Sequence, residues 1–204
     1  MQTIFCESRT KEALMRAFAG ECQSRQRYYQ AALTAQQQNH IVLERMFRFT
    51  AEQEERHAKQ FFELLSQCAG EKIEISGSYP ASVYNDLGQL LKSSAEEEYH
   101  EAVEVYPEFS KIAREEGFPD IASKFDMIAK IEDSHHKRFD YYLKLWEADM
   151  LQRSESTEEV WICLNCGHIH TGSEPPSECP VCGAQKGYFL REPEAPFTDG
   201  NMFK

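Results

Sequence analysis

The 204-residue sequence has little that would indicate a membrane protein, an exported protein or a nucleic-acid-binding protein. No apolar run approaches the ~18 residues that a membrane-spanning helix needs. The first residues lack the basic and apolar regions of a secretory signal. Basic residues are a minority, 22 against 34 acidic ones, and the formal net charge is −12. We therefore expect a cytoplasmic protein without nucleic acid or anionic lipid as a partner.

Composition changes near residue 151. Glycine and proline are sparse before it, where long stretches are rich in Ala, Glu, Gln, Lys and Leu. After it, residues 151–158 are rich in Ser and Glu and are typical of a linker. The sequence predicts a helical domain over 1–150 and a small, loop-rich domain over 159–204, which holds four of the seven cysteines.

Apolar residues recur with a period near 3.6 in four segments, at about 11–38, 41–68, 82–116 and 120–150. Gly117 and Pro119 should end the third helix and begin the fourth. Pro107 should bend the third helix or force a local π or 3₁₀ adjustment. The residues between the second and third helices could extend over roughly 40 Å, the length of a ~27-residue helix. We expect an all-α four-helix bundle with a long crossover between helices 2 and 3.

Each predicted helix interrupts its apolar stripe with glutamate near the middle. The interrupting residues are Glu21, Glu54, Glu98 and Glu132, and His57 and His135 follow two of them by three residues. Buried carboxylates are costly unless they are neutralised, so four at similar depth indicate bound cations. One Glu and one Glu-x-x-His from each half of the bundle is the ligand set of di-iron and di-manganese carboxylate proteins. Oxygen-rich ligands with one imidazole per metal suit Fe or Mn better than structural Zn.

A single Glu-x-x-His on a Glu-rich helix is usually solvated surface, but two copies on apolar stripes favour metal ligands. Glu101, three residues after Glu98, is a seventh candidate and would allow one metal two coordination sets, with Glu101 in one redox state and His57 in the other. Tyr28 and Tyr106 are candidates to donate hydrogen bonds to ligands, or they are ordinary core tyrosines. The other histidines do not share the pattern and are expected on the surface or behind the ligands: His40, His100, His136, His168 and His170.

Two Cys-x-x-Cys-Gly motifs in the tail predict a site with four thiolate ligands. The ligands would be Cys163, Cys166, Cys179 and Cys182. A zinc ribbon is the structural alternative, whereas an oxidisable metal pair in the same chain favours a single redox-active iron that delivers electrons. The expected aromatic core of this domain is Trp161, Tyr188, Phe189 and Phe197. The remaining cysteines, Cys6, Cys22 and Cys68, are predicted to be free thiols, which fits a reducing cytoplasm.

Over essentially its whole length the sequence resembles the rubrerythrins. The resemblance is carried by Ala19–Glu21, Glu54–Lys59, Glu98–Glu101, Tyr106–Pro107, Ala113–Phe118, Glu132–His135 and the two cysteine motifs. It implies a ferritin-like bundle with a non-haem di-iron site and a C-terminal rubredoxin-like domain holding one Fe in a Cys₄ site.

The resemblance also implies residue roles. Glu54 and Glu132 would bridge the two irons, and Glu21 would be terminal on the first iron. Glu98 and His135 would be terminal on the second iron. The first iron would be bound by Glu101 when oxidised and by His57 when reduced.

The implied activity is reduction of hydrogen peroxide to water in defence against oxidative stress. Electrons would pass from rubredoxin or an NAD(P)H-linked reductase through the Cys₄ iron, and the protein would be a homodimer. Two alternatives remain open at this point. One is ferroxidase and iron storage, and the other is a non-enzymatic scaffold whose zinc ribbon binds a partner.

Overall fold

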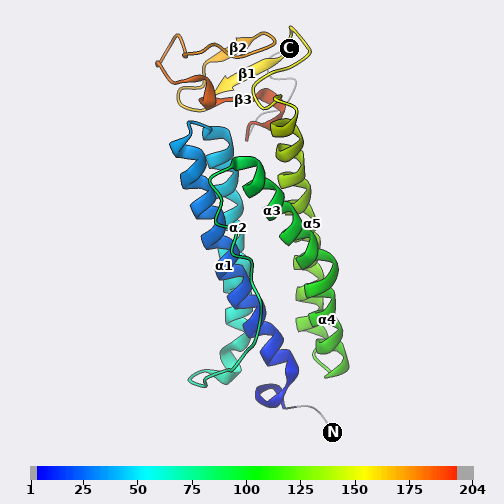
Figure 1. Ribbon diagram of the computed structural model, residues 1–204. Coiled ribbons are helices and arrows are strands. Elements are labelled where there is room, and N and C mark those ends of the chain that lie inside the picture. The colour runs from blue at the N-terminus through cyan, green and yellow to red at the C-terminus, as the bar shows by residue number, and fades with distance from the viewer. Residues whose placement is uncertain (1–3, 197–204) are drawn as a thin grey trace.

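The computed structural model describes residues 4–196. Its α-helices are α1 (Arg9–Gln37), α2 (Ile41–Leu64), α3 (Leu87–His100), α4 (Tyr106–Glu115) and α5 (Pro119–Glu147). Helices α1 and α2 run side by side in opposite directions, and α5 packs along α3 and α4, which follow one another (Figure 1). The predicted all-α, ferritin-like four-helix bundle is therefore confirmed. Among residues 4–196, no helix is both long and apolar enough to cross a membrane.

The helices begin and end where side chains or backbone conformation satisfy their termini. Ser8 accepts a hydrogen bond from the backbone N–H of Lys11, so α1 begins slightly before the predicted residue 11. Asp86 caps α3 in the same way, which places its start at Leu87 and corrects the prediction of residue 82. Gly117 has φ +88°, the left-handed conformation expected after a helix end, and α5 begins at a proline.

The third predicted helix is interrupted, as the position of Pro107 indicated. A π-helical segment, η3 (Glu101–Val105), separates α3 from α4. Proline cannot donate a backbone hydrogen bond, so a local change in winding accommodates it. This change in winding places Glu101 at the first residue of η3.

The connection between α2 and α3 runs from one end of the bundle to the other. It begins after η2 (Leu65–Cys68), at the end where α1 starts, and reaches the opposite end before α3 (Figure 1). The side chain of Gln38, just after α1, donates to the backbone oxygen of Asn85 over 2.7 Å. The predicted long crossover is confirmed, and it makes α3 antiparallel to α5.

Two apolar clusters lie on either side of a polar layer in the bundle. Phe47 and Phe139 belong to the cluster nearer the C-terminal domain, and Phe61 and Phe125 belong to the other. On α2 and α5, the predicted metal ligands fall between these phenylalanines in sequence. The polar layer is therefore enclosed by well-packed apolar side chains above and below.

The C-terminal domain is a small antiparallel sheet with strand order β2-β1-β3. Its strands are β1 (Val160–Cys163), β2 (Ile169–Thr171) and β3 (Phe189–Arg191), and the short helices η4 (Lys186–Tyr188) and η5 (Glu192–Glu194) flank β3. Trp161 and Phe189 form the buried core with Tyr188 packed against them, as predicted, whereas Phe197 lies outside the described residues. The predicted small rubredoxin-like domain is confirmed.

This domain packs on one end of the bundle (Figure 1). Leu151 and Leu190 belong to the same buried cluster as the nearest bundle residues. Gly187 approaches the turn between α1 and α2 so closely that a Cβ atom would lie 1.6 Å from the backbone oxygen of Asn39. Only glycine fits this contact, because any side chain would overlap backbone that cannot rotate away.

Two of the three cysteines expected to be free are bonded to each other. Cys6, in η1 (Phe5–Glu7), forms a disulfide with Cys68 at the end of η2. The prediction of free thiols was wrong for this pair, because α1 and α2 are antiparallel and bring residues 6 and 68 to the same end of the bundle. Cys22 is a free thiol, as predicted.

Candidate metal centres

Six predicted ligands converge in the polar layer from α1, α2, α3 and α5, and all six are buried. Their donor atoms form two groups, and within each group all donor atoms lie within 4.8 Å of one another. The first group consists of Glu21, Glu54, His57 and Glu132. The second group consists of Glu54, Glu98, Glu132 and His135. Glu54 and Glu132 belong to both groups, which is the arrangement needed for carboxylates that bridge two metals.

His57 faces three carboxylates of the first group. Its Nδ1 lies 3.0 Å from Oε1 of Glu132, 3.2 Å from Oε2 of Glu54 and 3.5 Å from Oε2 of Glu21. Because two of these carboxylates come from other helices, the contacts join α1, α2 and α5 around one point.

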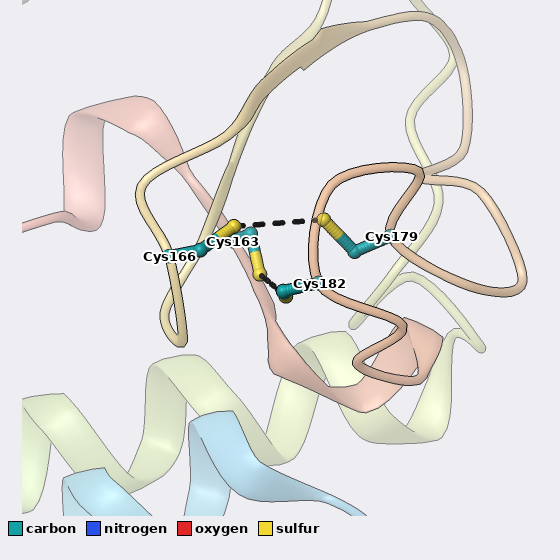
Figure 2. Close-up of side chains that lie close together, drawn as sticks. All are labelled: Cys163, Cys166, Cys179 and Cys182. Carbon is teal, nitrogen blue, oxygen red and sulfur yellow. Dashed lines mark hydrogen bonds between the residues drawn. The ribbon is translucent and has the colours of Figure 1, made fainter.

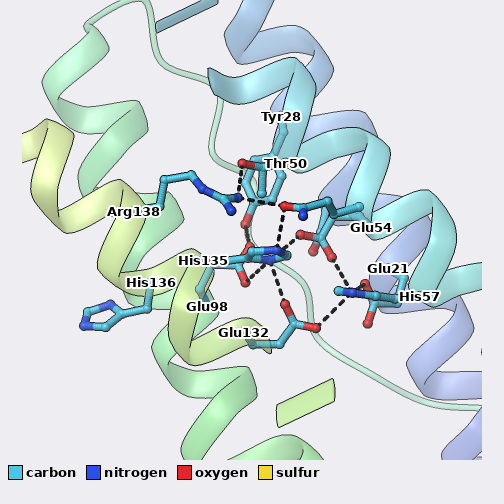
Figure 3. A network of polar contacts seen from close by, with 12 residues as sticks. Glu21, Tyr28, Thr50, Glu54, His57, Glu98, Glu132, His135, His136 and Arg138 are labelled. Atoms are coloured by element: carbon cyan, nitrogen blue, oxygen red, sulfur yellow. Dashed lines mark hydrogen bonds and ion pairs between the residues drawn. The ribbon is translucent and has the colours of Figure 1, made fainter. Parts of the chain in front are cut away.

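His135 has the same relation to the second group (Figure 3). Its Nδ1 lies 2.8 Å from Oε2 of Glu132, 2.9 Å from Oε1 of Glu54 and 3.3 Å from Oε2 of Glu98. The two imidazole rings are nearly parallel, with centroids 5.6 Å apart. Each half of the bundle thus contributes one Glu and one Glu-x-x-His to the site.

The donor atoms are arranged to bind metal ions and not to form hydrogen bonds with one another. Both carboxylate oxygens of Glu132, Oε1 of Glu54 and Nδ1 of His135 are buried without a partner in hydrogen-bond geometry. Oxygens of Glu21 and Glu98 are in the same condition. Buried polar atoms are almost always hydrogen-bonded, so a converging set without such bonds indicates cations. Carboxylates with one imidazole per group suit a di-iron pair.

Burial and mutual repulsion shift the pKa values of these residues strongly. Burial, with the charges of neighbouring glutamates, raises the pKa of Glu21 and of Glu98 well above the usual value. Burial alone would lower the pKa of His135, but the carboxylates of Glu132, Glu54 and Glu98 outweigh it and raise the value to about 12. In the metal-free protein, protons therefore partly replace the positive charge of the metals.

Two tyrosines donate hydrogen bonds to candidate ligands, which is the first of the two alternatives that the sequence left open. The hydroxyl of Tyr28 donates to Oε1 of Glu98, and the hydroxyl of Tyr106 donates to Oε1 of Glu21. Both tyrosines are buried. Each carboxylate is thus fixed on one oxygen and leaves the other toward the ligand groups.

Three residues that the sequence did not single out form a hydrogen-bonded chain that contacts Nε2 of His135, the ring nitrogen that faces away from the ligand group. Nε2 of His135 lies 3.1 Å from Oε1 of Gln53, and the Arg138 guanidinium donates to that same oxygen and to Oγ1 of Thr50, each over 2.9 Å. An imidazole that binds metal through Nδ1 carries its proton on Nε2, where Gln53 can accept it. Gln53 and Arg138 therefore orient this ligand.

Glu101 is the one predicted ligand that lies in neither group. It begins the π-helical segment, and its Oε2 is buried without a hydrogen-bond partner. His57, and not Glu101, is therefore the fourth member of the first group. The other histidines also lie outside both groups, and His136, for example, points away and contacts the backbone oxygen of Ala95 at 2.9 Å (Figure 3).

The four predicted cysteine ligands converge between two loops of the C-terminal domain (Figure 2). The Sγ atoms of Cys163 and Cys182 are 3.8 Å apart, and those of Cys166 and Cys179 are 3.6 Å apart. Thiolates at ~2.3 Å from a tetrahedral metal would lie ~3.8 Å from each other. Contacts from the Asn165 side chain and the Ala184 backbone lower the pKa of Cys182 to about 6, whereas the pKa of Cys166, despite a contact from the His168 backbone, is raised to about 12 by desolvation and the neighbouring thiols. A bound cation would therefore be needed to keep all four as thiolates. The geometry fits a rubredoxin-type iron.

The bundle metals should bind more tightly as the pH rises. A raised pKa in the folded state means that the proton stabilises the fold below the unfolded pKa and that this stabilisation is lost as pH rises through the folded value. For His135 that window runs from ~6.5 to about 12. The pKa of Glu54 is lowered by its contacts with His135 and His57 against the effect of burial. The stabilisation from Glu54 is therefore fully present above the usual glutamate range and is lost only as the pH falls below it.

We therefore expect the metal-free bundle to lose thermal stability between about pH 6.5 and pH 9. Metal bound to the deprotonated ligands should restore it and release protons. Circular-dichroism melting of metal-free and Mn²⁺-loaded protein, with calorimetry in buffers of different ionisation enthalpy, measures both effects. Metal binding without proton release would contradict the protonation states described above.

Comparison with known proteins identifies relatives of both domains. A family model described as rubrerythrin matches residues 12–143, and one described as "Rubrerythrin, rubredoxin-like domain" matches residues 161–190. The chain is 40% identical to a rubrerythrin of Clostridium perfringens over 184 residues, covering 89% of this chain and 93% of the relative. It is 39% identical to a rubrerythrin of Nitratidesulfovibrio vulgaris over 183 residues, with the same two shares.

Solved structures share the fold of the chain. A structure titled "Fully reduced state of nigerythrin (all ferrous)" superposes with a TM-score of 0.60 at 26% identity, covering 93% of this chain and 92% of that one. A bacterioferritin of Desulfovibrio desulfuricans, at 22% identity and a TM-score of 0.62, shares the fold over 70% of this chain and 82% of its own.

Proposed function

Because the chain belongs to the rubrerythrin family, we propose that it reduces hydrogen peroxide to water at a di-iron site in the bundle. Electrons would arrive through the Cys₄ iron from rubredoxin or an NAD(P)H-linked reductase. The observation that supports this most is the combination, in one chain, of two carboxylate–imidazole groups that share Glu54 and Glu132 with a separate four-thiolate site. An iron-storage role would not need the thiolate site, and a scaffold would not need the buried carboxylates.

Some of these residues would bind the irons, and others position the residues that bind them. The six buried ligands would hold the irons, which when bound supply the two electrons needed to cleave the O–O bond of peroxide. Tyr28 and Tyr106 fix Glu98 and Glu21, while Gln53 and Arg138 fix the orientation of His135. Pre-positioned ligands lower the reorganisation needed during turnover.

Glu101 would complete the site by moving. Its buried Oε2 has no hydrogen-bond partner that would have to be given up, and it lies in a π-helical segment, a winding often found at functional sites. We propose that Glu101 binds the first iron in the oxidised protein and that His57 binds it in the reduced protein.

The quaternary structure and location are proposed on the resemblance to rubrerythrins. We propose a homodimer in which the C-terminal domain of one subunit approaches the di-iron site of the other. A reducing cytoplasm would preserve the four thiolates of the Cys₄ site. Light scattering coupled to size-exclusion chromatography measures the subunit number.

The test of the function is a comparison of two oxidants. The iron-loaded protein is reduced anaerobically and mixed in a stopped-flow instrument with one equivalent of peroxide or with dissolved oxygen. We expect rapid oxidation of the di-iron site by peroxide and slower oxidation by oxygen. Equal or faster oxidation by oxygen would overturn the peroxide assignment.

Glu101→Ala should slow peroxide turnover by about 10- to 100-fold, because the oxidised first iron would lose a carboxylate ligand. The absorption of the Cys₄ iron should persist, since Glu101 lies in the bundle. Glu104→Ala is the matched control, because Glu104 is in the same π-helical segment but is exposed. Unchanged turnover of Glu101→Ala would remove Glu101 from the active set.

A further inference from the structure

A second cluster of reactive side chains lies at the end of the bundle opposite the C-terminal domain (Figure 1). It consists of the bonded pair Cys6 and Cys68, whose Cα atoms are 5.7 Å apart, and the exposed residue Glu71. Both sulfur atoms and a carboxylate oxygen of Glu71 lie within 4.8 Å of one another. None of these residues belongs to the two metal centres described above.

We propose that Cys6 and Cys68 form a second, metal-independent peroxide-reactive site, in which two thiols are oxidised reversibly to the disulfide. In the reducing cytoplasm proposed above, thiols are kept reduced, so Cys6 and Cys68 would form a disulfide there only when an oxidant reaches them. The chemistry needs no iron, so the proposal stands apart from the di-iron function.

The reaction has two steps. The Cys6 thiolate attacks one oxygen of hydrogen peroxide, the O–O bond breaks, and the departing hydroxide takes a proton to become water, which leaves a sulfenic acid on Cys6. The Cys68 sulfur then attacks the Cys6 sulfur, the S–O bond breaks, and a second water leaves. Two thiols and one peroxide thus give one disulfide and two waters. An external dithiol reverses the reaction by thiol–disulfide exchange.

The surroundings assign the roles of the two cysteines. Cys6 is half-buried, whereas Cys68 is 4% exposed, so peroxide in solvent reaches Cys6 first. The ammonium group of Lys11 donates to the backbone oxygen of Cys6 over 2.8 Å and places a positive charge beside this residue, which favours its thiolate. Cys68 is then the cysteine that resolves the sulfenic acid.

Glu71 is the group that we assign to the proton transfer, because its carboxylate oxygen lies within 4.8 Å of both sulfur atoms. Its carboxylate can accept the proton of the attacking Cys68 thiol and return it to the departing oxygen.

The disulfide would change how strongly the segment before α1 is attached to this end of the bundle. Phe5, next to Cys6, packs edge-to-face on Phe118 with ring centroids 5.5 Å apart. The backbone N–H of Arg9 donates to Oε1 of Glu116 over 3.1 Å. The cross-link therefore joins α2 to a segment that already contacts the turn between α4 and α5, and its reduction would release one of these attachments.

The test uses the full-length, iron-loaded protein in its diferric form. Its thiols are reduced with a phosphine, the reductant is removed under anaerobic conditions, and peroxide is added before quenching with an alkylating agent. Trypsin separates the two cysteines, so mass spectrometry can measure the disulfide-linked peptide. We expect one disulfide-linked peptide for each peroxide consumed. Cys22 should remain a free thiol and therefore be alkylated in the quench. A dithiol should reopen the link.

Variants separate the roles. Glu71→Gln, a change on the surface, should slow formation of the linked peptide by about tenfold or more. Cys68→Ser should accumulate a sulfenic acid on Cys6 that a dione reagent traps. Oxidation of Cys22 as fast as of Cys6, or a link that neither the phosphine nor the dithiol opens, would overturn the proposal. An unchanged rate in Glu71→Gln would remove Glu71 from it.

Discussion

Replacing Glu132 with glutamine should remove both metals from the bundle and lower peroxide turnover by about 10³-fold or more, which corresponds to ~4 kcal/mol of activation free energy. Glu132 belongs to both ligand groups, and its two oxygens face the Nδ1 atoms of His57 and His135 at 3.0 and 2.8 Å. An amide keeps the size of the side chain but loses the negative charge and one of the two ligand oxygens. Metal analysis and single-turnover kinetics with peroxide measure the two effects.

Asp133→Asn is the matched control for this prediction. It makes the same chemical change one residue further along α5, where the side chain is partly exposed and paired with Lys137. We expect this variant to bind metal and turn over peroxide as the unchanged protein does. The Cys₄ iron should absorb normally in both variants, which shows that the C-terminal domain is folded. A Glu132→Gln protein that retains two bundle irons would contradict the assignment of a bridging carboxylate.

The ligand cluster could be predicted from the sequence because burial of charge leaves a clear signal. An apolar stripe shows which face of a helix points inward, and a glutamate on that stripe has to be neutralised. Glu21, Glu54, Glu98 and Glu132 each interrupt such a stripe, and the structure brings all four together. Glu101 also follows the stripe and begins the π-helical segment, but it belongs to neither group of donor atoms, which a period of 3.6 does not predict.

The residues behind the ligands leave no such signal. Gln53 and Arg138 fall beside the apolar stripes, where polar residues are expected on any helix surface. Their role depends on the relative placement of α2 and α5, which brings Oε1 of Gln53 to Nε2 of His135. Sequence spacing gives the face of each helix but not which side chains of two different helices meet.

The disulfide was missed although its signal was present. Cys6 precedes α1 and Cys68 follows α2, and the short turn between these helices makes them antiparallel neighbours. The start of one helix and the end of the other must then lie at the same end of the bundle. Metal-binding motifs elsewhere in the chain favour free thiols at the remaining cysteines, whereas the positions of the helix ends favour the bond between Cys6 and Cys68.

Opening the disulfide should lower the stability of the folded bundle considerably. The two cysteines are 62 residues apart in sequence, and closing a loop of that length reduces the entropy of the unfolded chain by an amount worth about 4 kcal/mol at 25 °C. For a chain of this size, that loss corresponds to a decrease in Tm of about 10 °C. Circular dichroism at 222 nm follows the helices as metal-loaded, oxidised and phosphine-reduced protein is heated.

The comparison with variants identifies the cause of the change in Tm. Cys6→Ser lacks the cross-link, and because Cys6 is half-buried the substitution loses little packing, so its Tm should match that of the reduced protein. Cys22→Ser removes a thiol that forms no cross-link and should melt as the oxidised protein does. If the oxidised and reduced proteins have the same Tm, the segment before α1 must come away from the bundle before the helices unfold. The stabilisation expected from loop closure would then be contradicted, because only a cross-link that constrains the globally unfolded chain provides it.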